Sequence, residues 1–174
     1  QKGGKIGLFG GKDITGAVLV NAITGECQYY DIGEVPSWID RVYPSELLLE
    51  QLNNWGKYTH GFFNTIFSQK GVLKPTDGYN YIALNDDVYL YTGLTSVSND
   101  ASNVGFALIN MRTKEAKYYG ISGAEEYSAM SSAEGKVTDL KYTATFPILI
   151  NEADMIKKSL CVALSGLILS AAAV

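Results

Sequence analysis

The sequence predicts an α+β fold of antiparallel strands and two helical segments, in which strands outnumber helices. Twelve Tyr and eighteen Gly against four Pro, in 174 residues, favour strands joined by tight turns, because aromatic rings pack well on pleated surfaces. A short strand–turn–strand pattern occurs twice, and each copy precedes a segment that favours helix. Hydrophobic residues make up 47% of the chain and charged residues 18%, so we expect one well-formed core.

The first hairpin is predicted near the start of the chain. Residues 5–9 and 16–21 have strand character, and the second of these runs is apolar and β-branched. Residues 23–26 supply a turn with a Gly, and Cys27–Asp31 returns as the partner strand.

Helical spacing begins at Pro36. Pro44 is expected to separate a short helix over residues 38–42 from a second helix, which Ser45 caps and which continues through the leucines that follow. Residues 55–69 are harder to assign, but four side chains there would form one apolar helical face: Phe62, Phe63, Ile66 and Phe67.

The second half of the chain repeats the order of strands and then helix. We expect strands over residues 79–84, 88–92, 104–111 and 117–121. The run 88–92 shows no polar face, which favours a central position in the sheet. A helix over 124–133 and a strand over 142–150 complete the prediction, with Tyr142, Ala144 and Phe146 on one face of that strand.

The two predicted hairpins share more than a turn. Residues 21–32 and 110–121 agree at six of twelve positions without a gap, where chance gives on the order of one. The shared Tyr-Tyr-x-Ile ending is not required by turn chemistry, so we interpret the hairpins as a duplicated unit; the alternative is independent use of the same turn residues. In each Tyr pair, one ring should pack inward and the other should be displayed.

The run Val18-Leu-Val-Asn-Ala-Ile-Thr-Gly-Glu26 resembles the closing strand and turn of PepSY-type repeats, which have an apolar strand, an Asp or Asn, and then Thr-Gly-Glu or Thr-Gly-Lys. The second copy departs from that pattern, because Lys114 stands where the pattern has Gly. PepSY-type domains are associated with inhibiting or regulating peptidases. The resemblance therefore implies a binding or regulatory role and a protein or peptide partner.

Residues 18–151 also resemble an uncharacterised family of bacterial membrane-attached proteins, through the runs 35–44, 76–93 and 123–135. That resemblance implies an extracytoplasmic domain of a larger protein in the cell envelope, with its membrane context in segments outside this chain. It brings no activity and no catalytic residues.

We expect a PepSY-like α+β domain over residues 1–151, either as one domain or as two fused halves, 1–70 and 79–151. Residues 152–174 form an apolar tail with a basic start and a small-residue end, the layout of a signal peptide. Three interpretations of the tail stay open: a core helix, sequence joined from a neighbouring reading frame, and a tail anchor. The run from Leu160 to Val174 is short for a bilayer span, which disfavours the anchor.

Charge and cysteine usage exclude several classes of function. A net charge of −4 lacks the positive field that neutralises phosphates, so nucleic acid is not an expected partner. Cys27 and Cys161 lie far apart in unlike contexts, which excludes a CxxC pair and a zinc spacing and leaves a disulfide without support.

Candidate catalytic and metal-binding residues are few. His60 is the only histidine, so a triad mechanism needs it together with Ser45, Ser68 or Cys27, and no nucleophile-elbow motif accompanies it. Asp86 and Asp87, with Asp77 and Asp100, offer calcium ligands without EF-hand spacing, and Glu125 or Glu126 with Glu134 offers a carboxylate pair that we expect to be solvated. We therefore assign no catalytic residue, metal ligand or cofactor.

The remaining candidate site is aromatic. Exposed tyrosines bind peptides and glycans, because each ring combines an apolar body with a polar hydroxyl. Core packing explains most of these rings equally well. The predicted function is a non-enzymatic binding or regulatory module, with glycan or cell-wall binding as the alternative, and the candidate ligand-binding residues are Tyr29, Tyr118, Tyr79, Tyr81, Tyr89 and Tyr91.

Overall fold

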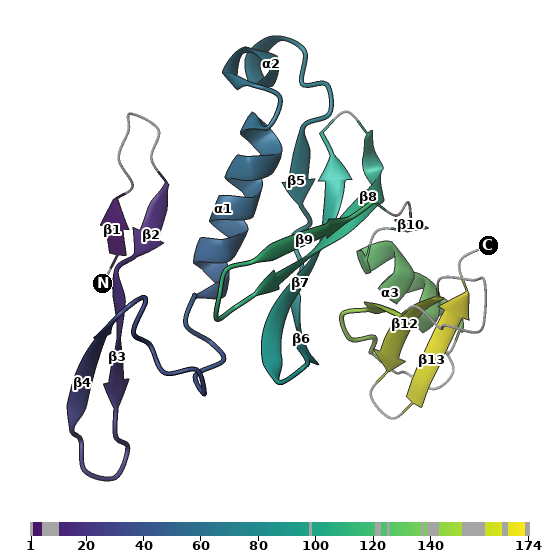
Figure 1. The fold of residues 1–174 in the computed structure, drawn as a ribbon. Coiled ribbons are helices and arrows are strands. Elements are labelled where there is room, and N and C mark those ends of the chain that lie inside the picture. The colour runs from purple at the N-terminus through teal and green to yellow at the C-terminus, as the bar shows by residue number, and fades with distance from the viewer. Residues whose placement is uncertain are drawn as a thin grey trace.

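Antiparallel strands and three helices make up the described part of the chain, which confirms the predicted α+β class (Figure 1). The computed structural model describes residues 2–4, 11–97, 99–120, 123–124, 126–136, 138, 143–150, 159–164 and 167–172. The helices are α1 (Ser45–Tyr58), α2 (Phe62–Phe67) and α3 (Glu126–Lys136). The strands are β1 (Lys2–Gly4), β2 (Lys12–Ile14), β3 (Gly16–Val20), β4 (Cys27–Asp31), β5 (Leu73–Pro75), β6 (Asn80–Leu84), β7 (Asp87–Ser96), β8 (Asn99–Asn110), β9 (Ala116–Tyr119), β10 (Gly123–Ala124), β11 (Ile148–Ile150), β12 (Ser159–Leu164) and β13 (Leu167–Ala172).

The main sheet is built around β7. This strand pairs with β8 along one edge and with β6 and β5 along the other, while β8 pairs further with β9 and β10, all antiparallel. The predicted central position of residues 88–92 is therefore confirmed. Because β7 has neighbours on both edges and side chains buried on both faces, Leu90, Thr92 and Leu94 have no exposed surface.

Helix α1 packs against one face of this sheet and completes the core (Figure 1). Its Leu48 and Leu52 lie one turn apart and share a buried cluster with residues of β7 and β8: Leu90, Leu94, Ala107 and Ile109, with Met111 just beyond. On its side towards β5, Gly56 lies so close to the backbone of Leu73 that a Cβ there would collide with the Leu73 carbonyl oxygen.

The β3–β4 and β8–β9 hairpins share the hydrogen bonds that the Asn and Thr side chains make to the turn backbone. In the first, the Asn21 Oδ1 accepts the Ile23 and Thr24 N–H groups at 2.9 and 3.2 Å, and in the second the Asn110 Oδ1 accepts those of Arg112 and Thr113 at 2.8 and 2.9 Å. The hydroxyl of the turn Thr accepts the N–H of the turn Glu at 3.3 Å in both copies. The turn residues that the two twelve-residue segments share therefore form the same local structure in both hairpins.

The correspondence extends into the strands. Gly16 and Gly105, each five residues before the turn Asn, lie under the first tyrosine of the following pair, Tyr29 and Tyr118. A Cβ on either Gly would collide with that ring. Lys114 adopts the left-handed conformation with φ 66°, as Gly25 does with φ 76°, so the departure at Lys114 keeps the backbone of the turn.

The segment before α1 is not helical, so the helix predicted over residues 38–42 is wrong. The N–H groups of Val42 and Tyr43 both donate to the Met111 carbonyl, at 3.0 and 2.9 Å, and these bonds hold the chain against β8 in place of a helical turn. The predicted cap at Ser45 is also wrong. Pro44 precedes the helix without a side-chain cap, and the Ser45 Oγ instead accepts the Tyr81 hydroxyl at 3.2 Å.

The other predicted elements form with shifted ends. The helical face of residues 62–67 is confirmed as α2, although Phe63, Ile66 and Phe67 are exposed there. The strand predicted over residues 142–150 is confirmed only for β11, since Ala144 makes an isolated bridge and residues 145–147 are irregular. The strand predicted over residues 5–9 lies outside the described residues.

The tail contains strands, so the core-helix interpretation is wrong for its described part. β12 and β13 pair with each other and β12 pairs with β11, all antiparallel. Ser165-Gly166 divides the apolar run into two six-residue halves, and a Gly at that point disfavours a continuous helix. Among the described residues, no helix has the length and apolar character that a membrane crossing requires.

Candidate functional site

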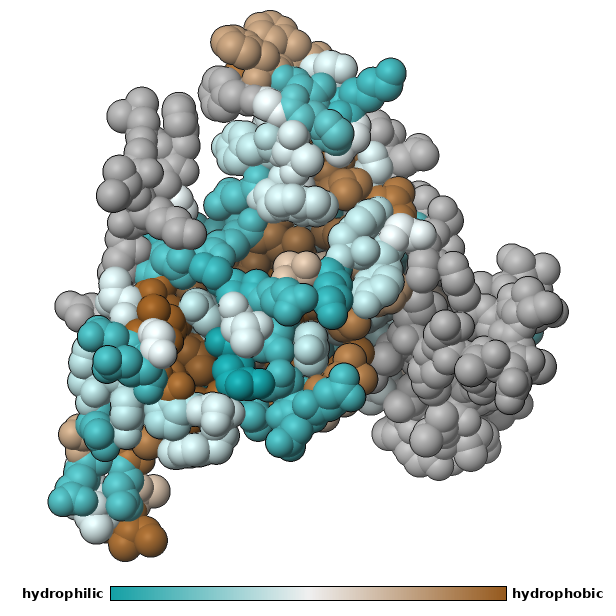
Figure 2. Space-filling model, in the orientation of Figure 1, coloured by the Kyte–Doolittle hydropathy of each residue, from teal (hydrophilic) through white to brown (hydrophobic). Residues whose placement is uncertain are grey.

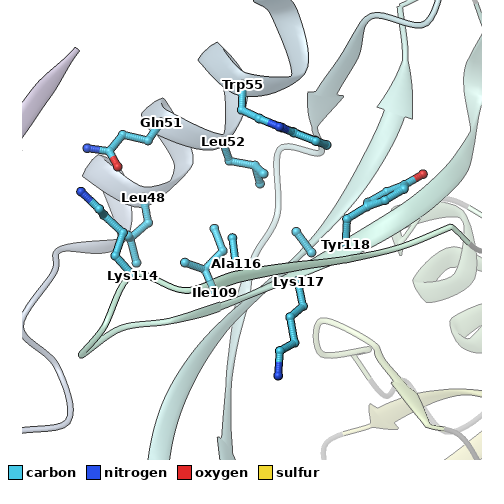
Figure 3. Close-up of a pocket in the computed structure, with 10 residues that line it drawn as sticks. Leu48, Gln51, Leu52, Trp55, Ile109, Lys114, Ala116, Lys117 and Tyr118 are labelled. Carbon is cyan, nitrogen blue, oxygen red and sulfur yellow. The ribbon is translucent and has the colours of Figure 1, made fainter. Parts of the chain in front are cut away.

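An apolar groove runs between α1 and the β8–β9 hairpin (Figure 3). Its volume is about 280 Å³. The floor comes from small and branched side chains of the two strands, and one wall comes from the leucines of α1. The residues that line it are Leu48, Gln51, Leu52, Trp55, Ala107, Ile109, Lys114, Ala116, Lys117 and Tyr118.

Two aromatic rings stand at one end of the groove. Trp55 of α1 and Tyr118 of β9 have centroids 6.2 Å apart with ring planes tilted by 48°, and both rings are nearly half exposed. The Tyr118 hydroxyl donates to the Val104 carbonyl at 3.3 Å, which helps to hold the ring in place. Figure 3 shows both rings flanking the open space beside Leu52.

The other end of the groove is polar. Lys114 donates to the Asp13 carboxylate at 2.7 Å, and its ammonium lies 5.2 Å from the centre of the Tyr43 ring. Lys117 points away from the groove, because neighbouring residues of a strand face opposite sides of the sheet (Figure 3). The lining is therefore mostly apolar, with its cation at Lys114 already paired.

Strand β9 offers backbone groups along the same groove. Within the described residues it pairs only with β8, and all four of its residues are exposed. The Asn110 N–H donates to the Glu115 carbonyl, so this pair is hydrogen-bonded and the next pair, Ile109 with Ala116, is not. By the same alternation, the N–H and C=O groups of Ala116 and Tyr118 point away from β8, and the side chains of these two residues face α1.

Five of the six predicted tyrosines lie on four different strands, and Tyr79 directly precedes β6. Tyr118 lines the groove, while Tyr29 lies on β4, where its hydroxyl donates to Asp31 at 3.1 Å. Tyr79 and Tyr81 form an edge-to-face pair 5.7 Å apart beside β6, and the Arg41 guanidinium lies 4.4 Å from the centre of the Tyr81 ring. They form separate exposed aromatic surfaces.

Tyr91 is buried, so its predicted place in an exposed aromatic platform is wrong. Only 3% of its surface is exposed, and its ring packs against Phe106 and Phe146. Tyr89, on the same strand, is half-buried. The central position of β7 and the burial of consecutive residues from Leu90 to Thr95, which face both sides of the sheet, explain both outcomes.

The expectation that one Tyr of each pair packs inward holds only in part. Tyr29 is exposed and Tyr30 half-buried in the first hairpin, but Tyr118 and Tyr119 are both exposed in the second. Tyr119 stacks on Phe106 with 4.8 Å between the ring centroids.

Trp55 is the groove residue that the sequence prediction missed. Leu48, Leu52 and Trp55 follow one another at spacings of four and three, which is the stripe of one helical face. That spacing was available in the sequence, but the tyrosine with which Trp55 pairs lies on another element. Only the packing of α1 across β8 and β9 brings the two rings together.

The candidate catalytic residues are not assembled. His60 is exposed in the loop after α1, with its ring over Gly71. Among the described residues, no hydrogen bond joins it to Ser45, Ser68 or Cys27, and Ser45 instead accepts a hydrogen bond from Tyr81.

The acidic candidates have structural partners. Asp87 accepts hydrogen bonds from the Asn110 amide at 2.8 Å and the Arg112 Nε at 2.7 Å, and these bonds hold the pKa of its carboxyl below the usual value. Asp77 is exposed, and the side chain of Asp100 lies outside the described ones. Within the part of the chain that the structure describes, no three metal-ligating residues gather at one point.

Glu126 is 1% exposed, so the expected solvation of this carboxylate is wrong. Gly93 of β7 has no side chain and leaves the space into which the Glu126 carboxylate fits. Glu134 accepts the Ala144 N–H at 2.8 Å, and Glu125 lies outside the described residues.

No protein-family model, curated protein or solved structure matches the chain.

Proposed function

We propose that this domain is a non-enzymatic binding module that takes an extended peptide segment of a partner protein beside β9. The observation that carries the proposal is the outward direction of the Ala116 and Tyr118 backbone groups along an apolar groove. An extended peptide can add to such an edge as a further antiparallel or parallel strand, because its own N–H and C=O groups complete the ladder.

The groove favours peptides with apolar side chains at alternate positions. Side chains of an added strand alternate between the two faces of the sheet, so every second one would enter the space between β9 and α1. Leu48 and Leu52 provide the apolar wall, and Trp55 with Tyr118 closes one end. Aromatic pairs at such positions contribute contact area with little loss of conformational entropy.

The wider context of the proposal comes from the sequence resemblance. A PepSY-like module would act on a peptidase or a peptide, and extended segments are the form in which peptides commonly bind to sheet edges. We place the domain on the outer side of a bacterial membrane, as part of a larger membrane-attached protein, on the same resemblance.

The test uses fluorescein-labelled synthetic ten-residue peptides with Leu or Val at alternate positions and Ser or Thr between them. Fluorescence anisotropy should show saturable binding to the wild-type chain. Ala116→Pro removes an N–H that points away from β8, so it should weaken binding at least about tenfold while leaving the fold intact, since proline is tolerated at sheet edges. Ala116→Ser keeps the N–H at similar volume and should bind normally.

Trp55→Ala gives an independent check on the same groove, because it removes one ring of the aromatic pair and no backbone group. Peptide affinity should fall again. If no peptide binds, or if peptides bind Ala116→Pro as tightly as wild type, the proposal is wrong.

Glycan binding is the second candidate, and the exposed Tyr79–Tyr81 pair with Arg41 is the observation that favours it. Adjacent rings and a guanidinium can stack on a sugar face and bond its hydroxyls. Chemical-shift changes at this surface on adding chitin oligosaccharides, absent in Tyr79→Ala, would support this function. Changes confined to the β9 groove on adding peptides would support the first one.

A further inference from the structure

The two hairpins present corresponding faces, and within the described residues a helix covers the face of the second hairpin but not that of the first. The turn Asn residues align the copies, so Val18 and Val20 of β3 correspond to Ala107 and Ile109 of β8. Cys27 and Tyr29 of β4 correspond to Ala116 and Tyr118 of β9 in the same way. The strand registers agree, since Val18 pairs with Tyr29 as Ala107 pairs with Tyr118.

Helix α1 covers this face in the second hairpin. Leu48 and Leu52 pack on Ala107 and Ile109, and Trp55 lies against Tyr118. The contacts come from positions i, i+4 and i+7 of one helical stripe. The β8–β9 unit thus shows how a helix lies on this kind of hairpin.

In the first hairpin the equivalent side chains are in contact with solvent. Val18, Val20 and Tyr29 are 59%, 57% and 49% exposed, and the adjoining Trp38 is 68% exposed. Val20, Cys27 and Trp38 line one shallow hollow. Figure 2 shows hydrophobic residues at the surface of this hairpin, at the lower left, and Figure 1 shows that it stands apart from α1. An isolated two-stranded hairpin is marginally stable, so we expect a partner to cover the exposed apolar side chains of this hairpin.

The charge around this surface is negative. Residues 14–40 contain four acidic residues and no Lys or Arg: Glu26, Asp31, Glu34 and Asp40. A helix of complementary charge for the first hairpin would therefore be basic.

We propose that the Val18–Val20–Cys27–Tyr29 face binds a basic amphipathic helix of a partner protein. The helix carries Leu or aromatic side chains at i, i+4 and i+7, as α1 does, and Lys or Arg beside that stripe. It lies across β3 and β4 as α1 lies across β8 and β9. This site is separate from the β9 groove. It binds a helix, whereas the groove binds an extended peptide.

The chain itself supplies the probe. A fluorescein-labelled peptide of residues 44–59 carrying Glu46→Lys and Glu50→Lys has the stripe of α1 and a positive charge, while the unmodified peptide has the same stripe and a net negative charge. The basic peptide should bind the full chain saturably in anisotropy measurements and gain helicity on binding. The unmodified peptide should bind at least about tenfold more weakly.

Substitutions on the hairpin locate the site. Val18→Asp and Val20→Asp place a carboxylate on the exposed face and should weaken binding of the basic peptide at least about tenfold, with little change in melting temperature. Ile23→Asp is the matched control, because Ile23 is 95% exposed in the turn and lies off the face. It adds the same negative charge and should leave binding equal or slightly tighter. Ala116→Pro, at the other site, should have no effect.

Three results would overturn the proposal. The first is no binding of the basic peptide, and the second is equal binding to wild type and Val18→Asp. The third is concentration-dependent self-association of the wild-type chain in sedimentation equilibrium that Val18→Asp abolishes, which would make a second copy the occupant.

Discussion

Asn21 and Asn110 make the same two hydrogen bonds in different surroundings. Each carboxamide oxygen accepts two backbone N–H groups of its turn, but Asn21 is exposed and Asn110 is buried. The Asn110 amide also donates to Asp87. Water can replace the lost acceptor more readily at the exposed Asn21 site than at the buried Asn110 site, so the same substitution should destabilise the two turns by different amounts.

Substitution of the two asparagines by alanine tests this difference. Asn110→Ala should lower the free energy of unfolding by about 1–3 kcal/mol, because it removes the acceptor of two part-buried N–H groups and leaves the Asp87 carboxylate without the Asn110 amide. Asn21→Ala should lower the free energy of unfolding by less than about 1 kcal/mol. Urea denaturation of both variants measures the two values, and equal losses would contradict the argument.

Asp87 makes stability depend on pH. Its folded-state pKa is held below the ordinary 3.8, first by the Asn110 amide, then by the Arg112 hydrogen bond and the Arg112 charge. A lowered folded-state pKa stabilises the fold above the unfolded value, and that stabilisation is lost as the pH falls through 3.8 towards the folded-state pKa.

Asp87→Asn should therefore melt below wild type at pH 6, and the difference should shrink at pH 3. Thermal melts at the two pH values give this comparison. Asp86→Asn is the neighbouring control, since Asp86 is exposed in the turn. A gap between Asp87→Asn and wild type that is as large at pH 3 as at pH 6 would rule out the role given to this carboxylate.

At the scale of elements, glycines decide how closely α1 approaches the sheet. Gly56 faces the Leu73 backbone of β5, whereas a Cβ on Gly135 of α3 would have no neighbour within 4 Å. Both positions are helical, so alanine gains similar helix propensity at each. Only at Gly56 does the added methyl group meet backbone that cannot move aside cheaply.

Gly56→Ala should destabilise the protein by about 1–3 kcal/mol, because overpacking against Leu73 exceeds the gain in propensity. Gly135→Ala should be neutral or stabilise it by up to about 1 kcal/mol. Chemical denaturation of the two variants gives opposite signs if α1 is seated on β5 as described.

The elements that the sequence predicted well are those that local chemistry determines. The turn residues Asn, Thr and Glu make their bonds within six residues, so both hairpins could be predicted from the chain alone. The prediction of a helix before Pro44 is wrong because it used only the local spacing of apolar residues. This segment is held by hydrogen bonds to Met111, which lies far along the chain. Tyr91 was misassigned for a related reason, since exposure depends on what covers a strand.

At the scale of the molecule, stability should differ between the two ends of the chain. β7 pairs along both edges and carries the core, whereas β3 and β4 pair only with each other among the strands that the structure describes. Two contacts connect β2 to the rest of the protein. Lys114 forms an ion pair with Asp13, and the Gln51 amide donates to the Lys12 carbonyl at 2.8 Å. Local opening of the first hairpin should therefore need less free energy than global unfolding.

Hydrogen exchange should show this difference residue by residue. Amides of residues 90–95 should exchange at a rate close to that set by global unfolding, and hydrogen-bonded amides of β3 and β4 at least about 100-fold faster. The basic peptide of residues 44–59 should slow exchange in β3 and β4 alone. Equal protection of β4 and β7 in the free protein would show that the hairpin does not open by itself.

The chain has two tryptophans, and each lies at one of the two proposed surfaces. Trp55 stands at the end of the groove beside Tyr118, and Trp38 lines the hollow at the first hairpin. Indole emission shifts to shorter wavelength when a ring leaves water. A Trp38→Phe chain is consequently an optical reporter for occupancy of the groove, and a Trp55→Phe chain reports on the hairpin face, without any label attached to the protein.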